Sequence, residues 1–337
     1  MKKVIGVVLA IAILASMLVL SGCSGKKQAE SKLCWYFPVA FPYADEVKTY
    51  VEQFSKDYNI DVKIMIGSDF EQATQDTNMR ALAASGYNGF SVFPSTAGAA
   101  GLYSELESQG INIVGYGAAT AEETEMFCVA TDVEAAAKTA CEEVIKAMGG
   151  KGGILNVLEA LTDTNTVKRQ KGVNEAIAEH DGVELVQEIA GMTSIDEAVE
   201  KITSALTANV QEINGIVCTG NATSSAAVQV LDDYYARNPD ADKIYLVCID
   251  TPEDVMQGIE KGIVYGTIAQ NIFAHGYIPL VILNMMGTEG YKQVEGTYFI
   301  DSGCVLVTKD NMDNFQADLQ AVTDQIIEEL PVKYLTK

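Results

Sequence analysis

The chain has 337 residues, and its 46 acidic and 23 basic side chains give a formal net charge of −23. Such an acidic surface excludes proteins that hold nucleic acid or anionic lipid headgroups on a basic face. The length allows two domains, each with its own core.

The N-terminus has the layout of an export signal. Lys2-Lys3 is a short basic region, and an apolar run follows from Val4 to Leu20. The sequence Leu20-Ser21-Gly22-Cys23 resembles a bacterial lipobox, which implies cleavage after residue 22 and a lipid on Cys23. The alternatives are an ordinary signal peptide or a membrane helix, but the apolar run is at the short limit for crossing a bilayer. The polar residues that follow, up to 31, predict a tether.

The seven cysteines show no metal-binding or redox spacing. No Cys-x-x-C occurs, and no cysteine stands beside a histidine at the spacing of a metal site. We therefore expect buried free thiols, although one disulfide stays open for an exported chain. Apart from Cys23, the cysteines lie in apolar strand-like segments or a helix: Cys34, Cys128, Cys141, Cys218, Cys248 and Cys304.

Strand-like and helix-like segments alternate from residue 33 onward. Short apolar runs predict strands, and the amphipathic segments between them predict helices. Such alternation is typical of parallel sheets covered by helices on both faces. In the first part the predicted strands are 33–37, 62–67, 89–93, 111–116 and 127–131, and the predicted helices are 44–58, 71–85 and 99–109.

The same pattern restarts after Asp132. Two successive α/β halves imply two lobes, and ligand sites prefer the cleft between such lobes. The predicted strands here are 154–158, 183–189, 213–218, 245–249 and 264–270, and the helices are 135–148, 166–179, 195–208 and 223–235. An apolar helix at 272–286, short strands at 297–300 and 305–308, and a helical tail at 311–330 complete the chain.

The stretch from Ile244 to Gln270 is the most informative. It predicts strand, turn, helix and strand, because Pro252 suits the first turn of a helix and Gly262 suits its end. Asp250 and Gln270 then stand at the carboxyl ends of two strands, which is the edge where open α/β sheets bind ligands. A carboxylate and an amide at that edge can hold adjacent hydroxyl groups. The alternative for Asp250 is a cap on the helix that follows.

The sequences Ile249-Asp250-Thr251-Pro252 and Thr267-Ile268-Ala269-Gln270 resemble periplasmic-type solute-binding proteins of the ribose/galactose class. The order of elements matches that family from about residue 32 to 308. The resemblance implies that Asp250 and Gln270 contact a sugar. It also implies two Rossmann-like lobes with parallel sheets, joined by a hinge that the chain crosses near Thr131-Asp132, Gln270-Asn271 and Asp301–Gly303.

These crossings divide the chain into lobes. The expected N-terminal lobe comprises 32–131 and 271–300, and the expected C-terminal lobe comprises 132–270 and 301–337. A signal peptide at 1–22 and a tether at 23–31 precede them.

The same resemblance nominates further ligand contacts. Tyr43 stands where the family places an aromatic ring after its first strand, with a position on the rim as the alternative. Asn221 and Asp132 each follow a predicted strand at the places where the family has polar contacts. Each is equally suited to capping the helix that follows it.

Two positions depart from the family pattern. Gly115-Tyr116-Gly117-Ala118 stands where sugar-binding relatives have Asp-Arg or Asp-Ser, which leaves Tyr116 as a substitute contact. Arg169-Gln170-Lys171-Gly172 keeps an R-x-x-G pattern, so Arg169 is a candidate contact, with a surface or structural ion pair as the alternative. These departures count against a simple pentose or hexose as the ligand, but not against the fold.

Enzyme motifs are missing from the sequence. It contains no G-x-x-x-x-G-K-[ST], no H-E-x-x-H and no G-x-S-x-G, and its two histidines are His180 and His275. A glycan-cleaving enzyme would need a second carboxylate opposite Asp250. We therefore predict a protein that is not an enzyme and needs neither a cofactor nor a metal.

The resemblance implies a monomeric, extracytoplasmic protein held at the cell membrane by lipid on Cys23. It would close around a sugar or polyol and deliver it to an ABC permease. The alternative is a sensory module that closes on the same ligand and signals to a membrane receptor or kinase.

Overall fold

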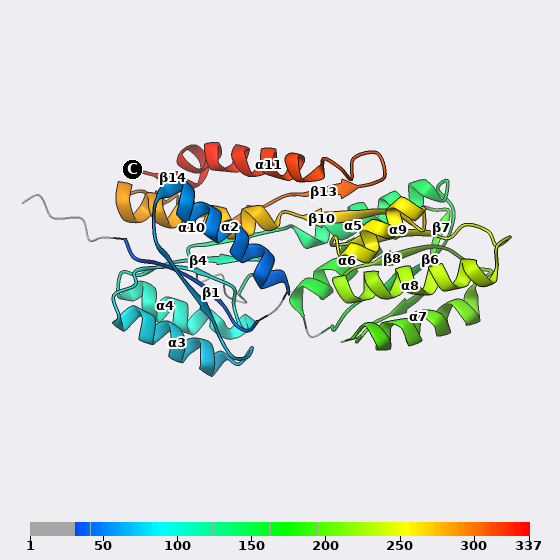
Figure 1. Cartoon of the computed structure of the whole chain (residues 1–337), viewed down its shortest axis with the longest axis horizontal. Coiled ribbons are helices and arrows are strands. Elements are labelled where there is room, and N and C mark those ends of the chain that lie inside the picture. The colour runs from blue at the N-terminus through cyan, green and yellow to red at the C-terminus, as the bar shows by residue number, and fades with distance from the viewer. Residues whose placement is uncertain (1–30, 41, 121, 123–124, 162, 193) are drawn as a thin grey trace, which may run out of the picture.

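Two lobes, each built on a six-stranded sheet, lie side by side in the computed structural model (Figure 1). The structure describes residues 31–337 except 41, 121, 123–124, 162 and 193. The predicted fold class is confirmed, because helices alternate with strands along both lobes and nearly all strand pairs are parallel. Cys23, the export signal and most of the predicted tether lie outside the described residues.

The sheet of the N-terminal lobe has the strand order β12-β5-β4-β3-β1-β2, and all neighbours are parallel. One edge strand, β2, comes from early in the sequence, and the other edge strand, β12, comes from near the C-terminus. The strands are β1 (Leu33–Phe37), β2 (Val62–Ile66), β3 (Gly89–Val92), β4 (Asn112–Tyr116), β5 (Phe127–Ala130) and β12 (Phe299–Asp301). The helices are α2 (Pro42–Tyr58), α3 (Gln72–Ala84), the short η1 (Ala97–Ala99), α4 (Ala100–Ser108) and α10 (Ile272–Glu289).

The side chains of β1 show how this sheet is covered on both faces. Leu33, Trp35 and Phe37 pack into the cluster that α2 and α10 complete. Cys34 and Tyr36 pack into the opposite cluster with α3 and α4. Because alternate side chains of a strand point to opposite faces, an uninterrupted apolar run is what a strand buried on both faces requires.

The sheet of the C-terminal lobe has the strand order β13-β10-β9-β8-β6-β7. Only β13 is antiparallel to its neighbour among the pairs described. The strands are β6 (Gly152–Val157), β7 (Val183–Ile189), β8 (Ile213–Cys218), β9 (Tyr245–Ile249), β10 (Val264–Gln270) and β13 (Cys304–Val307). The helices are α5 (Val133–Ala147), α6 (Thr164–Ala178), α7 (Ile195–Asn209), α8 (Asn221–Arg237) and α9 (Glu253–Lys261), and Gly262 ends α9 with φ 76°, as the sequence predicts.

The chain passes between the two sheets after β5, after β10 and between β12 and β13. We call these three passages the hinge. Asp301 joins two of them, because its Oδ1 accepts the N–H of Asp132 at 3.1 Å and that of Gly303 at 2.9 Å. Asn271 lies in the passage after β10. Its Nδ2 joins that passage to the one between β12 and β13 by donating to the carbonyl of Ser302 at 2.8 Å. The polar groups of the hinge therefore bond to one another.

The C-terminal segment is shared between the lobes, which differs from its assignment to the C-terminal lobe by sequence. Helix α11 (Phe315–Glu329) lies at the top of Figure 1, above α10 and reaching β13. Leu319 belongs to the core of the C-terminal lobe, but Ile326, Leu330 and Leu335 pack into the core of the N-terminal lobe. Strand β14 (Leu335–Thr336), which follows the short turn η2 (Leu330–Tyr334), pairs with β11 (Lys292–Gln293).

All cysteines in the described part of the chain are free. Five are buried and Cys304 is half-buried, as expected for unpaired thiols in apolar segments. None of the described helices combines the length and the apolar character needed to cross a membrane.

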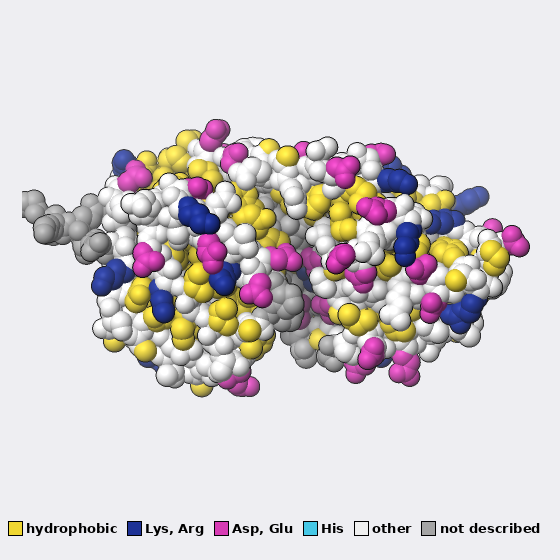
Figure 2. All heavy atoms as spheres, in the orientation of Figure 1, with side chains coloured by type: hydrophobic (Ala, Val, Ile, Leu, Met, Phe, Trp, Pro, Cys, Tyr) yellow, Lys and Arg dark blue, Asp and Glu magenta, His cyan; other side chains and the backbone are white. Residues whose placement is uncertain are grey.

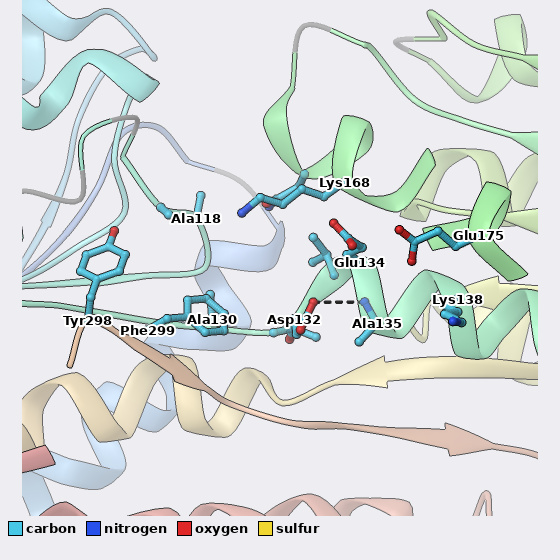
Figure 3. A pocket seen from close by; sticks show the side chains of 14 residues that line it. Ala118, Ala130, Asp132, Glu134, Ala135, Lys138, Lys168, Glu175, Tyr298 and Phe299 are labelled. Carbon is cyan, nitrogen blue, oxygen red and sulfur yellow. Dashed lines mark hydrogen bonds between the residues drawn. The ribbon is translucent and has the colours of Figure 1, made fainter. Parts of the chain in front are cut away.

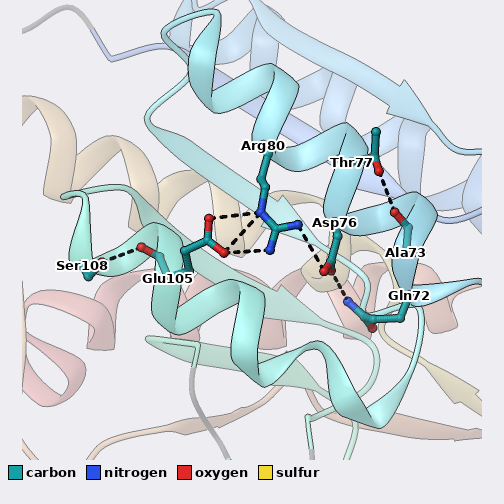
Figure 4. Close-up of polar contacts among 7 residues, drawn as sticks. All are labelled: Gln72, Ala73, Asp76, Thr77, Arg80, Glu105 and Ser108. Carbon is teal, nitrogen blue, oxygen red and sulfur yellow. Dashed lines mark hydrogen bonds and ion pairs between the residues drawn. The ribbon is translucent and has the colours of Figure 1, made fainter.

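Helices α3 and α4 are joined on the surface by a charged cluster (Figure 4). The Nη2 of Arg80 lies 2.7 Å from Oε2 of Glu105, and its Nη1 lies 3.4 Å from Oδ2 of Asp76. Because these groups are exposed to solvent, we expect the pairs to contribute little to stability.

Gly172 has a structural reason to be glycine. A Cβ at this position on α6 would lie 2.1 Å from the backbone oxygen of Glu134 on α5, so the two helices approach each other through the glycine. We predict that Gly172→Ala lowers the free energy of unfolding by about 1–3 kcal/mol, measured by chemical denaturation. Gly101→Ala on α4 is the matched control, because a Cβ there meets nothing within 4 Å. It should be neutral or stabilise by up to about 1 kcal/mol, and equal losses in both variants would contradict this account.

Candidate functional site

Asp250 and Gln270 meet at the carboxyl ends of two neighbouring strands. β9 and β10 pair in parallel, and each of the two side chains stands just at or beyond the end of its strand. The Nε2 of Gln270 donates to Oδ1 of Asp250 at 2.6 Å, and both residues are half-buried. Asp250 does not cap α9, since Pro252 is the N-cap and makes no side-chain cap bond. The sequence predicted the shared edge, and the structure places the two groups in direct contact.

The backbone of Asp250 is held in an unusual conformation. Its φ is 73°, in the left-handed region, which few residues other than glycine adopt. Two bonds fix it there: its N–H donates to the carbonyl of Ile268 at 2.9 Å, and its own carbonyl accepts from Oγ1 of Thr267 at 2.5 Å. Strained residues persist where surrounding contacts over-determine them, and such residues concentrate at functional sites. The carboxylate is therefore held in place before any ligand arrives.

Three aromatic rings of the N-terminal lobe form a cluster near Asp250. The centroid of Tyr43 lies 5.9 Å from that of Phe37 and 6.0 Å from that of Phe93. We call Phe37, Tyr43 and Phe93 the aromatic wall. Burial, and next the Asp250 carboxylate, raise the pKa of the Tyr43 hydroxyl well above its usual value. The wall of one lobe and the carboxylate of the other are therefore within electrostatic reach of each other.

Glu159 is a site carboxylate that sequence reasoning missed. It follows β6, and its Oε1 accepts the N–H of Ala222 in the first turn of α8 at 3.3 Å. A Cβ on Gly220 would lie 2.2 Å from the carboxyl carbon of Glu159, so the tight packing requires glycine. Burial raises the pKa of Glu159, Arg169 opposes that rise, and Asp250 adds to it. Glu159 is thus in the electrostatic range of two predicted site residues.

Arg169 is a buried cation with an unsatisfied donor. It is 7% exposed, and its Nε has no hydrogen-bond partner in the part of the chain that the structure describes. Buried polar groups normally find a partner, so an unfilled donor needs an explanation. An acceptor oxygen supplied by a ligand would provide one.

Carboxylates outnumber cations around this cleft. The pKa of Glu46 on α2 is raised by burial and then by Asp250, and Asp250 also raises the pKa of Glu159. Acidic side chains lie on both sides of the groove between the lobes in Figure 2. Arg169 is a buried cation that lowers the pKa of one of these three carboxylates, Glu159. The local field therefore disfavours anionic ligands.

Tyr116 and Asn221 differ in how they are placed. Tyr116 is fully buried, its hydroxyl donates to the carbonyl of Tyr36 at 3.2 Å, and its ring stacks on Trp35. We therefore treat Tyr116 as part of the core and omit it from the proposed site. Asn221 is exposed as the first residue of α8, where Gly220 is the N-cap, so its side chain is not engaged as the helix cap.

Asp132 caps α5, which was one of its two expected roles, and it also lines a pocket. Its Oδ1 accepts the N–H of Ala135 at 3.1 Å. The pocket, of about 430 Å³, lies between the lobes and is lined by Ala118 and Ala119 of one lobe and by Asp132, Glu134 and Lys168 of the other (Figure 3). We call it the hinge-side pocket. Asp250 and Gln270 do not line it.

One hydrogen bond links the lobes beside this pocket. The Nδ2 of Asn165, on α6, donates to the carbonyl of Gly117, after β4, at 3.4 Å. Gly117 also approaches the aromatic wall, because a Cβ there would lie 2.6 Å from the hydroxyl oxygen of Tyr43. The lobes are therefore already in contact at one edge of the cleft. In the described part of the chain, no group of three or more His, Cys, Asp or Glu side chains is arranged to hold a metal ion.

His275 supports Tyr43 from the side of the core. Its Nδ1 lies 2.9 Å from the hydroxyl oxygen of Tyr43, and its Nε2 lies 3.0 Å from Oγ of Ser302. The histidine is 1% exposed, and this burial lowers its pKa from 6.5 to about 3. At physiological pH the imidazole is therefore neutral, so it makes hydrogen bonds but does not act as an acid. The sequence offered no sign of this role beyond an isolated histidine in an apolar helix.

The sequence is similar to a protein-family model and to a known binding protein. A family model described as "Periplasmic binding protein domain" matches residues 39–289. A xylitol-binding protein from Mycolicibacterium smegmatis is 22% identical over 272 residues, which are 80% of this chain and 75% of that protein.

Solved structures of similar fold match this chain over nearly their whole length. A solute-binding protein of an ABC transporter from Burkholderia graminis, in complex with D-arabinose, has a TM-score of 0.75 at 20% identity over 86% of this chain and 99% of that one. A solute-binding protein from Bacillus halodurans with bound myo-inositol has a TM-score of 0.73 at 16% identity over 87% and 99%. At these identities the likeness establishes the fold.

The burial of neutral His275 predicts a pH-dependent stability. The unfolded chain binds a proton at this histidine below about pH 6.5, whereas the folded chain does so only near pH 3. The folded state therefore loses stability as the pH falls through this window, by at most about 1.4 kcal/mol per pH unit. We expect the stability difference between the native chain and His275→Gln to shrink on acidification from pH 7 to pH 5. A constant difference, measured by urea denaturation, would contradict the burial of a neutral imidazole.

Proposed function

The chain belongs to the periplasmic binding protein family, and from that premise we propose that it captures an uncharged sugar or polyol by closure of its two lobes. The family consists of binding proteins rather than enzymes, in line with the missing catalytic motifs. The observation that carries the proposal is the Asp250–Gln270 pair, held at the sheet edge with the aromatic wall within electrostatic reach.

The chemistry of the cleft favours a ligand with several hydroxyl groups. The carboxylates of Asp250 and Glu159 can accept hydrogen bonds from ligand hydroxyl groups. The unfilled Nε of Arg169 can donate a hydrogen bond to a ligand oxygen. Tyr43 is half-buried, so part of its side chain can lie against the C–H face of a sugar. The excess of carboxylates makes uronates and phosphorylated sugars poor ligands. A relative named for xylitol binding and two similar structures with bound D-arabinose or myo-inositol, all uncharged ligands, support this choice.

Closure is a shift between open and closed populations. A ligand that touches Asp250 in one lobe and Tyr43 in the other binds the closed state more tightly, and this difference in affinity drives closure. The hinge offers Gly303, at φ 76°, to absorb part of the backbone rotation. Asp132 and Asn221 would approach the ligand from the C-terminal lobe.

The cellular setting is part of the proposal. The N-terminal sequence supports export and attachment of lipid to Cys23, so the protein would work outside the cytoplasm at the membrane surface. There it would pass its ligand to an ABC importer as a monomer. The family and the two structures of ABC transporter solute-binding proteins support the role with an importer outside the cytoplasm, and the lipid anchor rests on the N-terminal sequence alone.

Thermal unfolding of the mature chain, from Ser24 onward, tests this function. The panel holds xylitol, D-arabinose and myo-inositol, with glucuronate and a sugar phosphate as anionic controls. A ligand at 100 times its dissociation constant adds about 2.7 kcal/mol, and a chain of this size shifts by roughly 2–4 °C per kcal/mol. We expect a shift with at least one uncharged polyol or sugar and none with the anions. A response to anions alone would overturn the proposal.

Asp250 and Gln270 are expected to carry much of the affinity. Hydrogen bonds to charged groups contribute about 1.5–3 kcal/mol, so Asp250→Ala should weaken binding by roughly 10–100-fold, measured by calorimetry. Gln270→Ala should weaken it as well, because it removes an amide contact and frees the carboxylate. Asp232→Asn is the control. Asp232 is an exposed carboxylate that pairs with Lys261, and it lies toward the C-terminal end of α8, whereas Gly220 is at the N-terminal end. Unchanged affinity in both site variants would refute the site.

A further inference from the structure

A chain of four hydrogen-bonding side chains leads from the aromatic wall to the hinge. The hydroxyl oxygen of Tyr43 lies 2.9 Å from Nδ1 of His275, and Nε2 of His275 lies 3.0 Å from Oγ of Ser302. Oγ of Ser302 in turn lies 3.2 Å from Oγ1 of Thr131. His275, Ser302 and Thr131 are all at least 96% buried, so water does not compete for these bonds. We call this set the polar chain.

The polar chain touches all three passages of the hinge. Thr131 begins the first passage, His275 lies in the first turn of α10 after the second, and Ser302 lies within the third. The side chain of Asn271 braces it, because Nδ2 donates to the carbonyl of Ser302 and to Oγ1 of Thr323. A change at Tyr43 can therefore reach the segments about which the lobes rotate.

The polar chain has a direction, because His275 is neutral. A neutral imidazole carries one N–H, so one ring nitrogen donates and the other accepts. In one direction Tyr43 donates to Nδ1, and Nε2–H donates to Ser302. In the other direction Nδ1–H donates to Tyr43, and Ser302 donates to Nε2. Both arrangements fit the same distances between the heavy atoms.

The two directions give the cleft different chemistry. In the first direction, the hydroxyl of Tyr43 donates its hydrogen bond to Nδ1 of His275. Among the described residues, this nitrogen is the acceptor within hydrogen-bond distance of that hydroxyl. In the second, the proton of Tyr43 is free for a ligand oxygen. The cleft is rich in acceptors, with Asp250 and Glu159, and one of its donors, Nε2 of Gln270, is already used on Asp250. The hydroxyl proton of Tyr43 would then be a donor to a ligand oxygen in addition to the unfilled Nε of Arg169.

We propose that His275 is a positioning residue whose tautomer sets the hydrogen-bonding direction of Tyr43, and that ligand binding reverses the polar chain as far as Thr131 at the hinge. The inference rests on the proposed function, because it requires a ligand at Tyr43. The imidazole stays neutral throughout: one proton leaves Nε2 and one is bound at Nδ1, exchanged with water during transient opening of the packing around His275. Ser302 turns its proton from Thr131 to Nε2, and Thr131 then donates to Ser302. No net proton is taken up.

Nitrogen NMR of the ring reads the tautomer directly. The sequence has two histidines, so ¹⁵N-histidine labelling gives two ring systems, and His180→Gln identifies that of His275. We expect the proton on Nε2 in the free protein at pH 7 and on Nδ1 in the protein saturated with the sugar or polyol that shifts its unfolding. The same tautomer in both states, with calorimetry showing saturation, would overturn the inference and leave the proposed function intact. If no sugar or polyol binds, both fail.

Ser302→Ala separates positioning from simple structural support. It removes the acceptor of Nε2–H, and a buried N–H without an acceptor is less tolerated than an unfilled acceptor. The free variant should therefore already hold the proton on Nδ1, and its affinity should rise by about 2–10-fold, because the competent tautomer is populated in advance. Weaker binding, or a proton still on Nε2, would contradict the proposal.

Tyr277→Phe is the matched control. It removes another hydroxyl from the same helix, one that donates to Oδ2 of Asp57 at 2.9 Å and has no bond to the polar chain. Its affinity should stay within about twofold of the native chain, and its His275 tautomer should respond to ligand as in the native chain. A loss of the tautomer change in this variant would show that general destabilisation, and not the polar chain, governs the histidine.

Discussion

Everything in this molecule depends on three passages of chain between two sheets. Each passage exposes backbone groups that no strand or helix satisfies, and such groups must find partners where they are shielded from water. Asp301 and Asn271 supply those partners by linking the passages to one another. The three passages are thereby bonded to one another, and Gly303 in the third passage has a φ of 76°. This bonded hinge is the structural basis of the lobe closure that we propose.

The cleft combines a fixed carboxylate with an unfilled donor. Asp250 is held by its backbone bonds and by Gln270, so little conformational freedom remains to be lost when a ligand binds. Arg169 is buried without a full set of partners, and Glu159, whose Oε1 accepts an N–H in the first turn of α8, is within its electrostatic range. An apolar core would exclude such groups. Their presence together at a sheet edge makes sense if a polar molecule completes their hydrogen bonds.

The sequence allowed most of the fold to be predicted, because its apolar runs alternate with amphipathic segments and because Gly262 marks a helix end that the structure confirms. The edge shared by Asp250 and Gln270 followed from the same pattern. Glu159 was missed because no motif surrounds it, and its role arises from the packing of Gly220. Tyr116 was misleading because a residue at a strand end can face either the cleft or the core. The polar chain through His275 joins segments far apart in sequence, so only the structure reveals it.

A crystal structure of the mature chain with its sugar or polyol tests the central claim most directly. The account predicts a closed cleft in which Asp250 and Gln270 bind neighbouring hydroxyl groups and the ring of Tyr43 lies against the ligand. The backbone changes should be confined to the three passages of the hinge. A ligand held in the hinge-side pocket between Lys138 and Lys168, out of reach of Asp250, Gln270 and Tyr43, would contradict the account.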